Sequence, residues 1–434
     1  MLKRVSLAVS FAVAVCVAPE AAQNTPPPRP IALEAAHLFD GVSGRLTDNG
    51  VIVVSDGRIQ RVGGPEPPGA EGIDLGDATL LPGFIDSHVH MDSEGQDNWY
   101  LGFYQGLMEF PAEQALRATV YAKKTLEAGF TTVRDLGSSD YVALGLRNAI
   151  QAGAIEGPRM LIANYAIGST AGHADQAPFP PERIAPAGPL QGVCNGADEC
   201  RAAVRYQIKY GADVIKFMPS GGVLSLTDPV DVPELTQEEM DAIVSEAHAW
   251  HRKVAAHCHG DQAAKMAIKA GVDSIEHGTF LQDDTLQLMK DKHVYLVATL
   301  FAGDWLRPRA DSLPPAIRDK ALQAAAAAQQ MFQHAVRIGT PIAFGTDSAV
   351  EPHGLDAREF ALMTKNGMAP ADALISATAS AAKLLGVDAE TGTLQAGKAA
   401  DVIAVAGNPL ADIRATEHPT FVMKDGKVYV RPKS

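Results

Sequence analysis

The sequence predicts an α/β protein: a (β/α)8 TIM barrel with a small β-sandwich domain that both ends of the chain build together. Three observations lead to this prediction. Eight short apolar segments alternate with helical stretches through the middle of the 434 residues, β-type segments flank that middle on both sides, and no GxGxxG pattern follows a first strand. The third observation argues against a doubly wound open sheet, which is the alternative fold.

The two ends of the chain have the same β character. Residues 31–80 contain short alternating runs separated by Asp-Gly and Gly-Gly turns, which is typical of short strands joined by tight turns. Near the other end, the Lys-Asp-Gly-Lys sequence at 424–427 predicts a hairpin turn. We therefore expect residues 31–80 and 388–434 to form one composite β domain, and residues 81–387 to form the barrel.

The middle of the chain supplies the expected barrel strands in order. Each is a nearly continuous apolar run, as parallel strands covered on both faces should be. The runs are GFIDSHVH (83–90), GFTTVRDLG (129–137), RMLIANYAIG (159–168), ADVIKFMPSGG (212–222), KVAAHCHG (253–260), VDSIEHG (272–278), VYLVATLF (294–301) and PIAFGTDS (341–348). Helical stretches between them include 112–129, 236–251, 261–271 and 316–339.

The N-terminus has the organisation of a secretory signal peptide. Lys3 and Arg4 precede an apolar stretch over residues 5–18, and small residues and a proline-rich run follow. We expect residues 1–22 to be removed, and the mature protein to be periplasmic or secreted without a stable membrane anchor. An uncleaved anchor is the alternative.

Three cysteines remain after that cleavage. Cys194 and Cys200 are close enough in sequence to form a disulfide in an oxidising compartment, and two free thiols are the alternative. Cys258 lies in an apolar run and is expected to be buried and unpaired.

The charge of the chain limits its partners. The net charge is −14, and no basic patch with interleaved aromatic residues is present in the sequence. We therefore expect no nucleic-acid partner and no anionic membrane partner.

Polar side chains end several of the expected barrel strands, at the edge where the active site of a barrel lies. His88 and His90 are two residues apart, so both point to the same face of the first strand. His257, His277 and Asp347 end the fifth, sixth and eighth strands. One buried histidine alone is more often a packing residue. Four histidines and an aspartate at one rim predict a metal site.

Lys216 lies inside the apolar fourth strand. A buried ammonium is unfavourable by several kcal/mol unless it is paired or neutralised. Addition of CO2 to the amine would produce a carbamate, an anionic oxygen ligand that can bridge two cations. Pairing with a nearby carboxylate, or extension of the side chain to solvent, is the alternative.

These residues together resemble the metal-dependent amidohydrolase superfamily. The resemblance rests on HVH after PGFID, the lysine in GADVIK, and the HCHG, EHG and GTD sequences, and it extends over TGTLQAGKAADVIAVAGNPL near the C-terminus. GADVIKFMPSGGV, VRDLG, the AGHAD loop and GTDS are most similar to the prolidase-related branch. Members of that branch hydrolyse dipeptides, N-acyl amino acids and, in some cases, the amide of ochratoxin.

The resemblance implies a binuclear centre with two divalent cations, expected to be zinc; manganese and iron suit the same ligands. It implies a site in which a carboxylated Lys216 (N6-carboxylysine, from CO2) and a hydroxide bridge the cations and the hydroxide attacks the amide. The implied ligands are His88, His90 and Asp347 for the first cation, His257 and His277 for the second, and Lys216 for both. The expected catalytic residues are Asp347, as the proton acceptor and donor, and His257.

The same resemblance, with the sequence around the strand ends, indicates how the substrate is bound. His173, in the loop after the third strand, and His259 are candidates for orienting the substrate, although loop or supporting roles are the alternative. Val223 is a candidate for lining the side-chain pocket. The expected partner is a small dipeptide or amide, and relatives imply a homo-oligomer such as an octamer.

Two other enzyme classes use the same scaffold. Mononuclear deaminases and imidazolonepropionase-like enzymes that open cyclic amides typically work with one metal. Lys216 argues against the deaminases, and the predicted export signal argues against the imidazolonepropionase-like enzymes, which belong in the cytosol. The sequence leaves the preferred side chains open.

Overall fold

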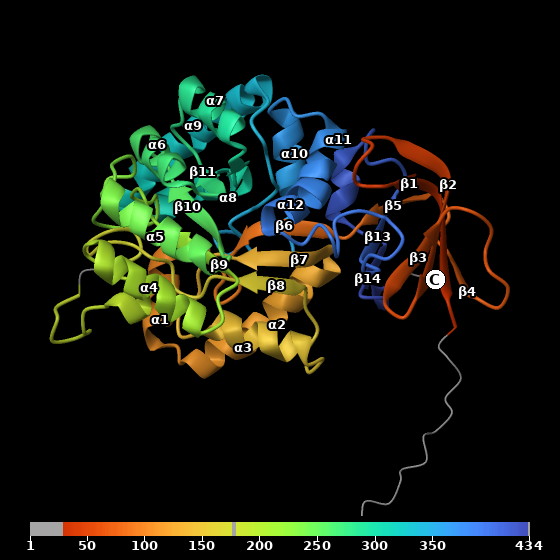
Figure 1. The fold of residues 1–434 in the computed structure, drawn as a ribbon, viewed down its shortest axis with the longest axis horizontal. Coiled ribbons are helices and arrows are strands. Elements are labelled where there is room, and N and C mark those ends of the chain that lie inside the picture. Colours follow the sequence, from red (N-terminus) through yellow and green to blue (C-terminus); the bar gives the residue numbers. More distant parts are fainter. Residues whose placement is uncertain (1–28, 176–178, 433–434) are drawn as a thin grey trace, which may run out of the picture.

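The computed structural model describes residues 29–175 and 179–432. The predicted signal peptide lies outside the described residues. Within them, no helix has the length and apolarity that a membrane crossing requires. Figure 1 shows a β-rich region at one end of the molecule and a larger region at the other, where helices surround parallel strands.

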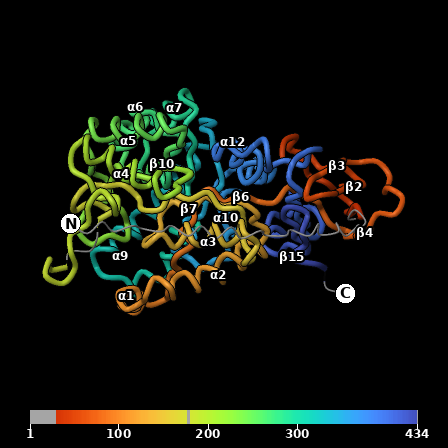
Figure 2. Tube along the Cα trace, turned by 60° about the horizontal axis from the view of Figure 1, so that its bottom comes forward, coloured from red at the N-terminus to blue at the C-terminus, as the bar shows by residue number. Residues whose placement is uncertain are grey.

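The β-rich region is an eight-stranded sheet that contains strands from both ends of the chain. Its order is β15-β14-β13-β5-β1-β2-β3, and β4 pairs with β1. The strands are β1 (Ile31–Phe39), β2 (Leu46–Ser55), β3 (Arg58–Val62), β4 (Glu71–Asp74), β5 (Ala78–Pro82), β13 (Val402–Ala406), β14 (Phe421–Lys424) and β15 (Lys427–Val430). In Figure 2 the red N-terminal strands and blue β15 lie at the same end of the molecule. The predicted hairpin is confirmed, because Lys424 pairs with Lys427 across an Asp425–Gly426 turn.

The larger region contains seven parallel strands in two sheets. Side chains on both faces of most of these strands are buried, which explains their nearly continuous apolar sequences. One sheet contains β6 (Phe84–Val89), β7 (Phe130–Asp135) and β8 (Arg159–Ile162). The other contains β9 (Val214–Phe217), β10 (Lys253–Cys258), β11 (Ser274–His277) and β12 (Tyr295–Val297).

Backbone hydrogen bonds connect these sheets. The Ile167 N–H, beyond β8, donates to the Lys216 carbonyl of β9 at 2.9 Å. The expected eighth strand, residues 341–348, is not a continuous strand, but isolated bridges and backbone hydrogen bonds join it to β12 and β6. Asp347 has a left-handed φ of 68°, which interrupts the extended conformation near the end of this segment. The arrangement is a TIM-barrel-like α/β fold.

Helices follow most of the strands and cover them. They are α1 (Trp99–Met108), α2 (Pro111–Glu127), α3 (Val142–Gln151), α4 (Ala197–Lys209), α5 (Gln237–Ala249), α6 (Asp261–Ala270), α7 (Asp283–Lys292), α8 (Leu300–Leu306), α9 (Pro315–Ile338), α10 (Arg358–Lys365), α11 (Pro370–Ile375) and α12 (Ala381–Leu385). Local sequence sets several boundaries. Thr236 and Glu239 form a capping box at the start of α5, and Gly339 ends α9 in the left-handed conformation.

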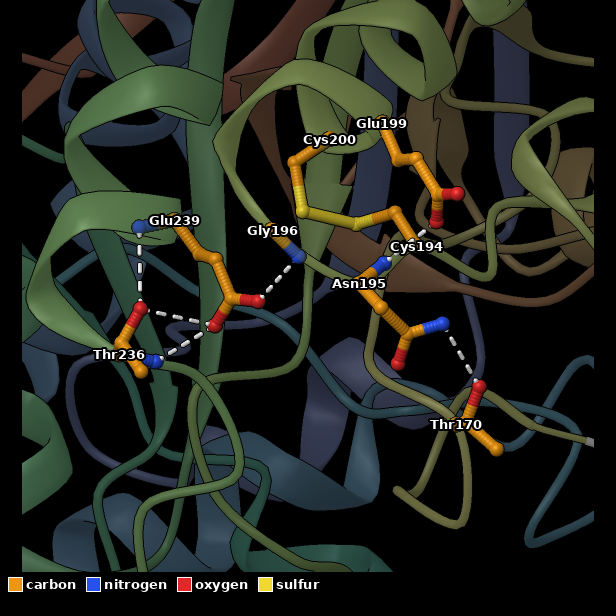
Figure 3. Close-up of a disulfide and its surroundings, with 8 residues drawn as sticks. All are labelled: Thr170, Cys194, Asn195, Gly196, Glu199, Cys200, Thr236 and Glu239. Carbon is orange, nitrogen blue, oxygen red and sulfur yellow. Dashed lines mark hydrogen bonds between the residues drawn. A yellow bond between two sulfur atoms is a disulfide. The ribbon is translucent and has the colours of Figure 1, made fainter.

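A disulfide joins Cys194 to Cys200 at the start of α4, with a Cα–Cα distance of 5.1 Å (Figure 3). The loop between them is also held by hydrogen bonds, because Gly196 N–H donates to Glu239 at 2.7 Å. Of the two sequence alternatives, the structure has the disulfide. Cys258 is free and buried, as expected.

Candidate metal centre and its cavity

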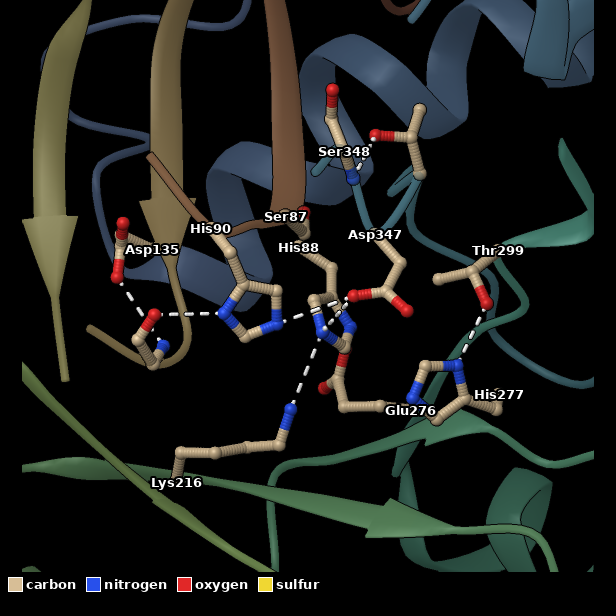
Figure 4. Close-up of polar contacts among 12 residues, drawn as sticks. Ser87, His88, His90, Asp135, Lys216, Glu276, His277, Thr299, Asp347 and Ser348 are labelled. Carbon is tan, nitrogen blue, oxygen red and sulfur yellow. Dashed lines mark hydrogen bonds and ion pairs between the residues drawn. The ribbon is translucent and has the colours of Figure 1, made fainter. Parts of the chain in front are cut away.

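His88, His90 and Asp347 converge at the carboxyl ends of the parallel strands. The Nε2 atoms of both histidines lie 3.2 Å from Oδ1 of Asp347. Figure 4 shows the two rings reaching from β6 and the segment after it toward the carboxylate. The i, i+2 spacing produces this convergence, because alternate residues of a strand share one face. Two imidazoles and a carboxylate at this separation are a suitable ligand set for a divalent cation.

A second group of imidazoles lies beside the first. His257 is the second-last residue of β10, His259 directly follows that strand, and His277 ends β11. Their ligand nitrogens lie within 4.8 Å of one another. Nε2 of His257 is buried and has no hydrogen-bond partner, so it is available to a cation. Burial lowers the pKa values of His257 and His277 well below the usual value, which favours the neutral, metal-binding form.

Lys216 lies between the groups, with Nζ 3.3 Å from Nε2 of His88. The side chain is 1% exposed. Burial lowers its pKa from 10.5 to about 8, although nearby Glu276 and Asp347 oppose that shift. The amine therefore has a larger neutral fraction than an exposed lysine, and the neutral amine is the form that adds CO2.

A buried network of charged side chains orients the imidazole of His88. The Nδ1–H of His88 donates to Oε2 of Glu276 at 2.9 Å, and Arg134 pairs with the other carboxylate oxygen of Glu276 at 2.9 Å. Burial disfavours the Glu276 carboxylate, but Arg134 and His88 outweigh it and lower its pKa to about 2. This arrangement fixes the tautomer that leaves Nε2 of His88 free for a cation.

Sequence reasoning did not identify Arg134 or Glu276 as functional. Both lie inside apolar runs, VRDLG and SIEHG, and a charged residue inside a buried strand was the available signal.

The other imidazoles are oriented in the same way. Nδ1–H of His90 donates to the Gly137 carbonyl at 2.8 Å. Nδ1 of His277 hydrogen-bonds with the Thr299 hydroxyl at 2.8 Å, as Figure 4 shows. His277 and Asp347 both have φ near 68° (67° and 68°), in the left-handed region. A left-handed conformation is uncommon for non-glycine residues, and here it sets the direction of two side chains of the site.

The predicted substrate residues lie beside the same centre. The His173 ring centroid is 4.4 Å from that of His257, and His173 Nδ1 is buried without a partner. His259 belongs to the second imidazole group itself, with Nδ1 hydrogen-bonded to Thr279 at 2.7 Å. Val223 is partly buried. All nine predicted site residues line one cavity of about 600 Å³.

This geometry defines a class of protein. Two adjoining groups of imidazoles with a carboxylate and a lysine, at the strand ends of a TIM-barrel-like fold, are the candidate metal centre of a metal-binding barrel protein. The chain belongs to the Amidohydrolase family, whose model matches residues 79–429.

Similarity to individual known proteins indicates the branch of this family to which the chain belongs. Ochratoxinase from Aspergillus niger is 36% identical over 379 residues, which cover 81% of this chain and 76% of that protein. The crystal structure of a Xaa-Pro dipeptidase with bound methionine in the active site superposes with a TM-score of 0.89 at 40% identity, over 92% of this chain and 100% of that chain. The A. niger ochratoxinase structure has a TM-score of 0.82 at 33% identity, over 93% and 96%.

The expected branch is therefore confirmed. The chain is a member of the prolidase-related amidohydrolases and a hydrolase of amide or peptide C–N bonds.

Proposed function

We propose that the protein hydrolyses the amide bond of dipeptides or N-acyl amino acids, including ochratoxin-type amides, at a centre of two divalent cations. The observation that carries this proposal is the convergence of five implied ligands and Lys216 around one cavity. The similarity to a Xaa-Pro dipeptidase and to an ochratoxinase supports the substrate class.

The residues present fit such a centre. His88, His90 and Asp347 would hold one cation, and His257 and His277 would hold the other. Carboxylated Lys216 would contribute to both, and zinc is the expected metal. When bound, the cations would lower the pKa of a water molecule and polarise the scissile carbonyl.

Asp347 is the proposed proton carrier. Burial opposes its ionisation, but His88 and His90 outweigh this effect and lower its pKa well below the usual value. It therefore begins the reaction ionised and can accept the proton of the attacking water. It would then deliver that proton to the leaving amine.

His173, His259 and Val223 are proposed to contact the substrate. His173 has an unpartnered buried nitrogen that can hydrogen-bond a polar substrate group. Val223 offers an apolar surface in the same cavity.

The surrounding architecture is also proposed. The bridges of residues 341–348 with β12 and β6 support a closed barrel over residues 81–387. The pairing of β5 with β13 supports a composite β domain from residues 31–80 and 388–434. The disulfide is consistent with export directed by residues 1–22, to the periplasm or outside the cell. Homo-oligomeric assembly is proposed on the family resemblance alone.

One experiment tests the function. Metal content is measured on purified protein, and dipeptides and N-acyl amino acids are screened by released amine. We expect about two metal ions per chain, and cleavage that chelation abolishes and zinc with bicarbonate restores. Protein without stoichiometric metal, or metal-loaded protein that releases no amine, would refute the proposal.

A further inference from the structure

One part of the cavity, called the chamber below, has an apolar wall. The residues of this wall are Trp99, Val223, Leu224, Leu313 and Ala321. These five residues line the cavity and pack together in one hydrophobic cluster. They come from three parts of the chain: the start of α1, the loop after β9, and the region where α9 begins. The cavity volume of about 600 Å³ is in the range that suits ring-containing ligands.

The chamber depends on a loop with no regular secondary structure, residues 222–228. This loop carries Val223 and Leu224, and Lys320 of α9 lies against it. The Lys320 ammonium donates to the carbonyls of Gly222 and Ser225, both at 2.7 Å, and to that of Asp228 at 3.1 Å. All three N–H donors of the ammonium are therefore used on one loop.

The loop is closed by a further contact. The Gly222 N–H donates to the Asp228 carboxylate at 2.7 Å. Burial lowers the pKa of Lys320, although the nearby carboxylates of Asp228 and Glu234 oppose that shift. Lys320 does not line the cavity itself.

The same loop touches the reaction centre. A Cβ on Gly222 would lie 2.1 Å from the ring of His173, so the backbone there packs directly against that imidazole. A shift of the loop would move the chamber wall and His173 together. The position of Gly222 is in turn set by Lys320, through the carbonyl that accepts its hydrogen bond.

We propose that Lys320 is a positioning residue that sets selectivity for a large apolar group, such as a phenyl-bearing group, next to the scissile amide. It does so by holding Val223 and Leu224 in the chamber wall. This inference rests on the proposed function and adds to it the size and polarity of one substrate group. The group it selects is uncharged, because none of the five chamber side chains carries a charge and four of them are aliphatic.

The test compares Lys320→Met with Lys290→Met. Lys290 also donates to a backbone carbonyl, that of Ile338 at 2.6 Å, but at the other end of α9. The substrates are N-acetylglycine, N-(3-phenylpropionyl)glycine and N-acetylphenylalanine. We expect Lys320→Met to lower the preference for a phenyl-bearing substrate, as a ratio of kcat/KM values, by about tenfold. Lys290→Met should leave this ratio of kcat/KM values as it is in the unmodified protein.

A purely structural role for Lys320 would lower activity on all three substrates equally and leave the ratio unchanged, which would overturn the inference. If Lys320→Met does not fold, Leu224→Ala replaces it, because that variant removes a wall side chain without disturbing the lysine. Leu224→Ala should lower the same ratio, and an unchanged ratio would again overturn the inference.

Calorimetric binding to metal-loaded protein separates this inference from the proposed function. We expect 3-phenylpropionate to bind more tightly than acetate, and that difference to fall in Lys320→Met but not in Lys290→Met. If no amide is cleaved, the proposed function fails, and the calorimetric difference still decides the role of the chamber. Equal binding of both acids by the unchanged chain would overturn the inference.

Discussion

Replacement of Glu276 by glutamine tests whether the buried chain behind His88 supports the metal centre. Glu276 is fully buried and accepts hydrogen bonds from Arg134, Ser274 and His88. The amide is nearly isosteric but uncharged. The glutamine amide has one acceptor oxygen where the carboxylate has two, so it can accept from Arg134 or from His88 but not from both, and the positive charge of Arg134, itself 1% exposed, loses its buried counter-charge.

Two effects follow from these contacts. Removal of one partner of a buried ion pair lowers the free energy of unfolding by about 3–5 kcal/mol. Loss of the carboxylate behind a ligating histidine lowers metal affinity by about 10–100-fold, or about 1.4–2.8 kcal/mol. Denaturant unfolding of the metal-free protein measures the first effect. Competition for zinc with a chromophoric chelator measures the second.

Asp401→Asn is the matched control. Asp401 is also buried and pairs with an arginine, Arg159, at 2.7 Å, but it does not line the cavity. Asp401→Asn should lower the free energy of unfolding by a similar amount and leave the zinc affinity unchanged. If Glu276→Gln binds zinc as tightly as the unchanged chain, Glu276 is only a structural residue and the reasoning is wrong.

Three further predictions follow from the same structure. Asp347→Asn should lower kcat by about 10²–10⁴-fold; near-normal turnover with metal still bound would exclude the proton-carrier role. Burial raises the pKa of Glu359, which accepts from two N–H groups at the start of α8, from 4.5 to about 8. Between pH 4.5 and 8 the folded state therefore binds more protons than the unfolded state, so the free energy of unfolding should decrease as the pH rises over this range. Glu359→Gln should flatten this pH dependence in unfolding experiments. An unaltered pH dependence would contradict the prediction. Cys194→Ser with Cys200→Ser should lower the free energy of unfolding by about 2 kcal/mol, and equal stability of reduced and oxidised protein would contradict this value.

The strand pattern and the ligand positions were predictable because they depend on local sequence. A strand buried on both faces must be apolar over its whole length, so polar residues in or at the end of such a run are conspicuous. His88, Lys216 and His277 were identified in this way, and each lies at the predicted cavity. The predicted β segments at the chain ends also correspond to observed strands, because tight turns separate them.

Other features depend on contacts between distant segments. The chain from Arg134 through Glu276 to His88 joins three strands, and no single run of sequence contains it. The eighth expected strand is only partly regular for a related reason. Its apolar sequence is typical of a strand, but Asp347 adopts a left-handed conformation that aims its carboxylate at the histidines.

The metal ligands could be predicted from the sequence, whereas the residues that position the chamber wall could not. Metal ligands lie on or next to strands, whose two-residue period fixes the side-chain direction. The chamber wall lies on an irregular loop, whose conformation is set by a lysine on a helix nearly 100 residues further along the chain. A change at Glu276 should therefore alter metal affinity without changing substrate preference, whereas a change at Lys320 should alter preference without changing metal affinity. Coupled changes in both variants would mean that the loop and the ligand strands move as one unit, and this separation of roles would then be wrong.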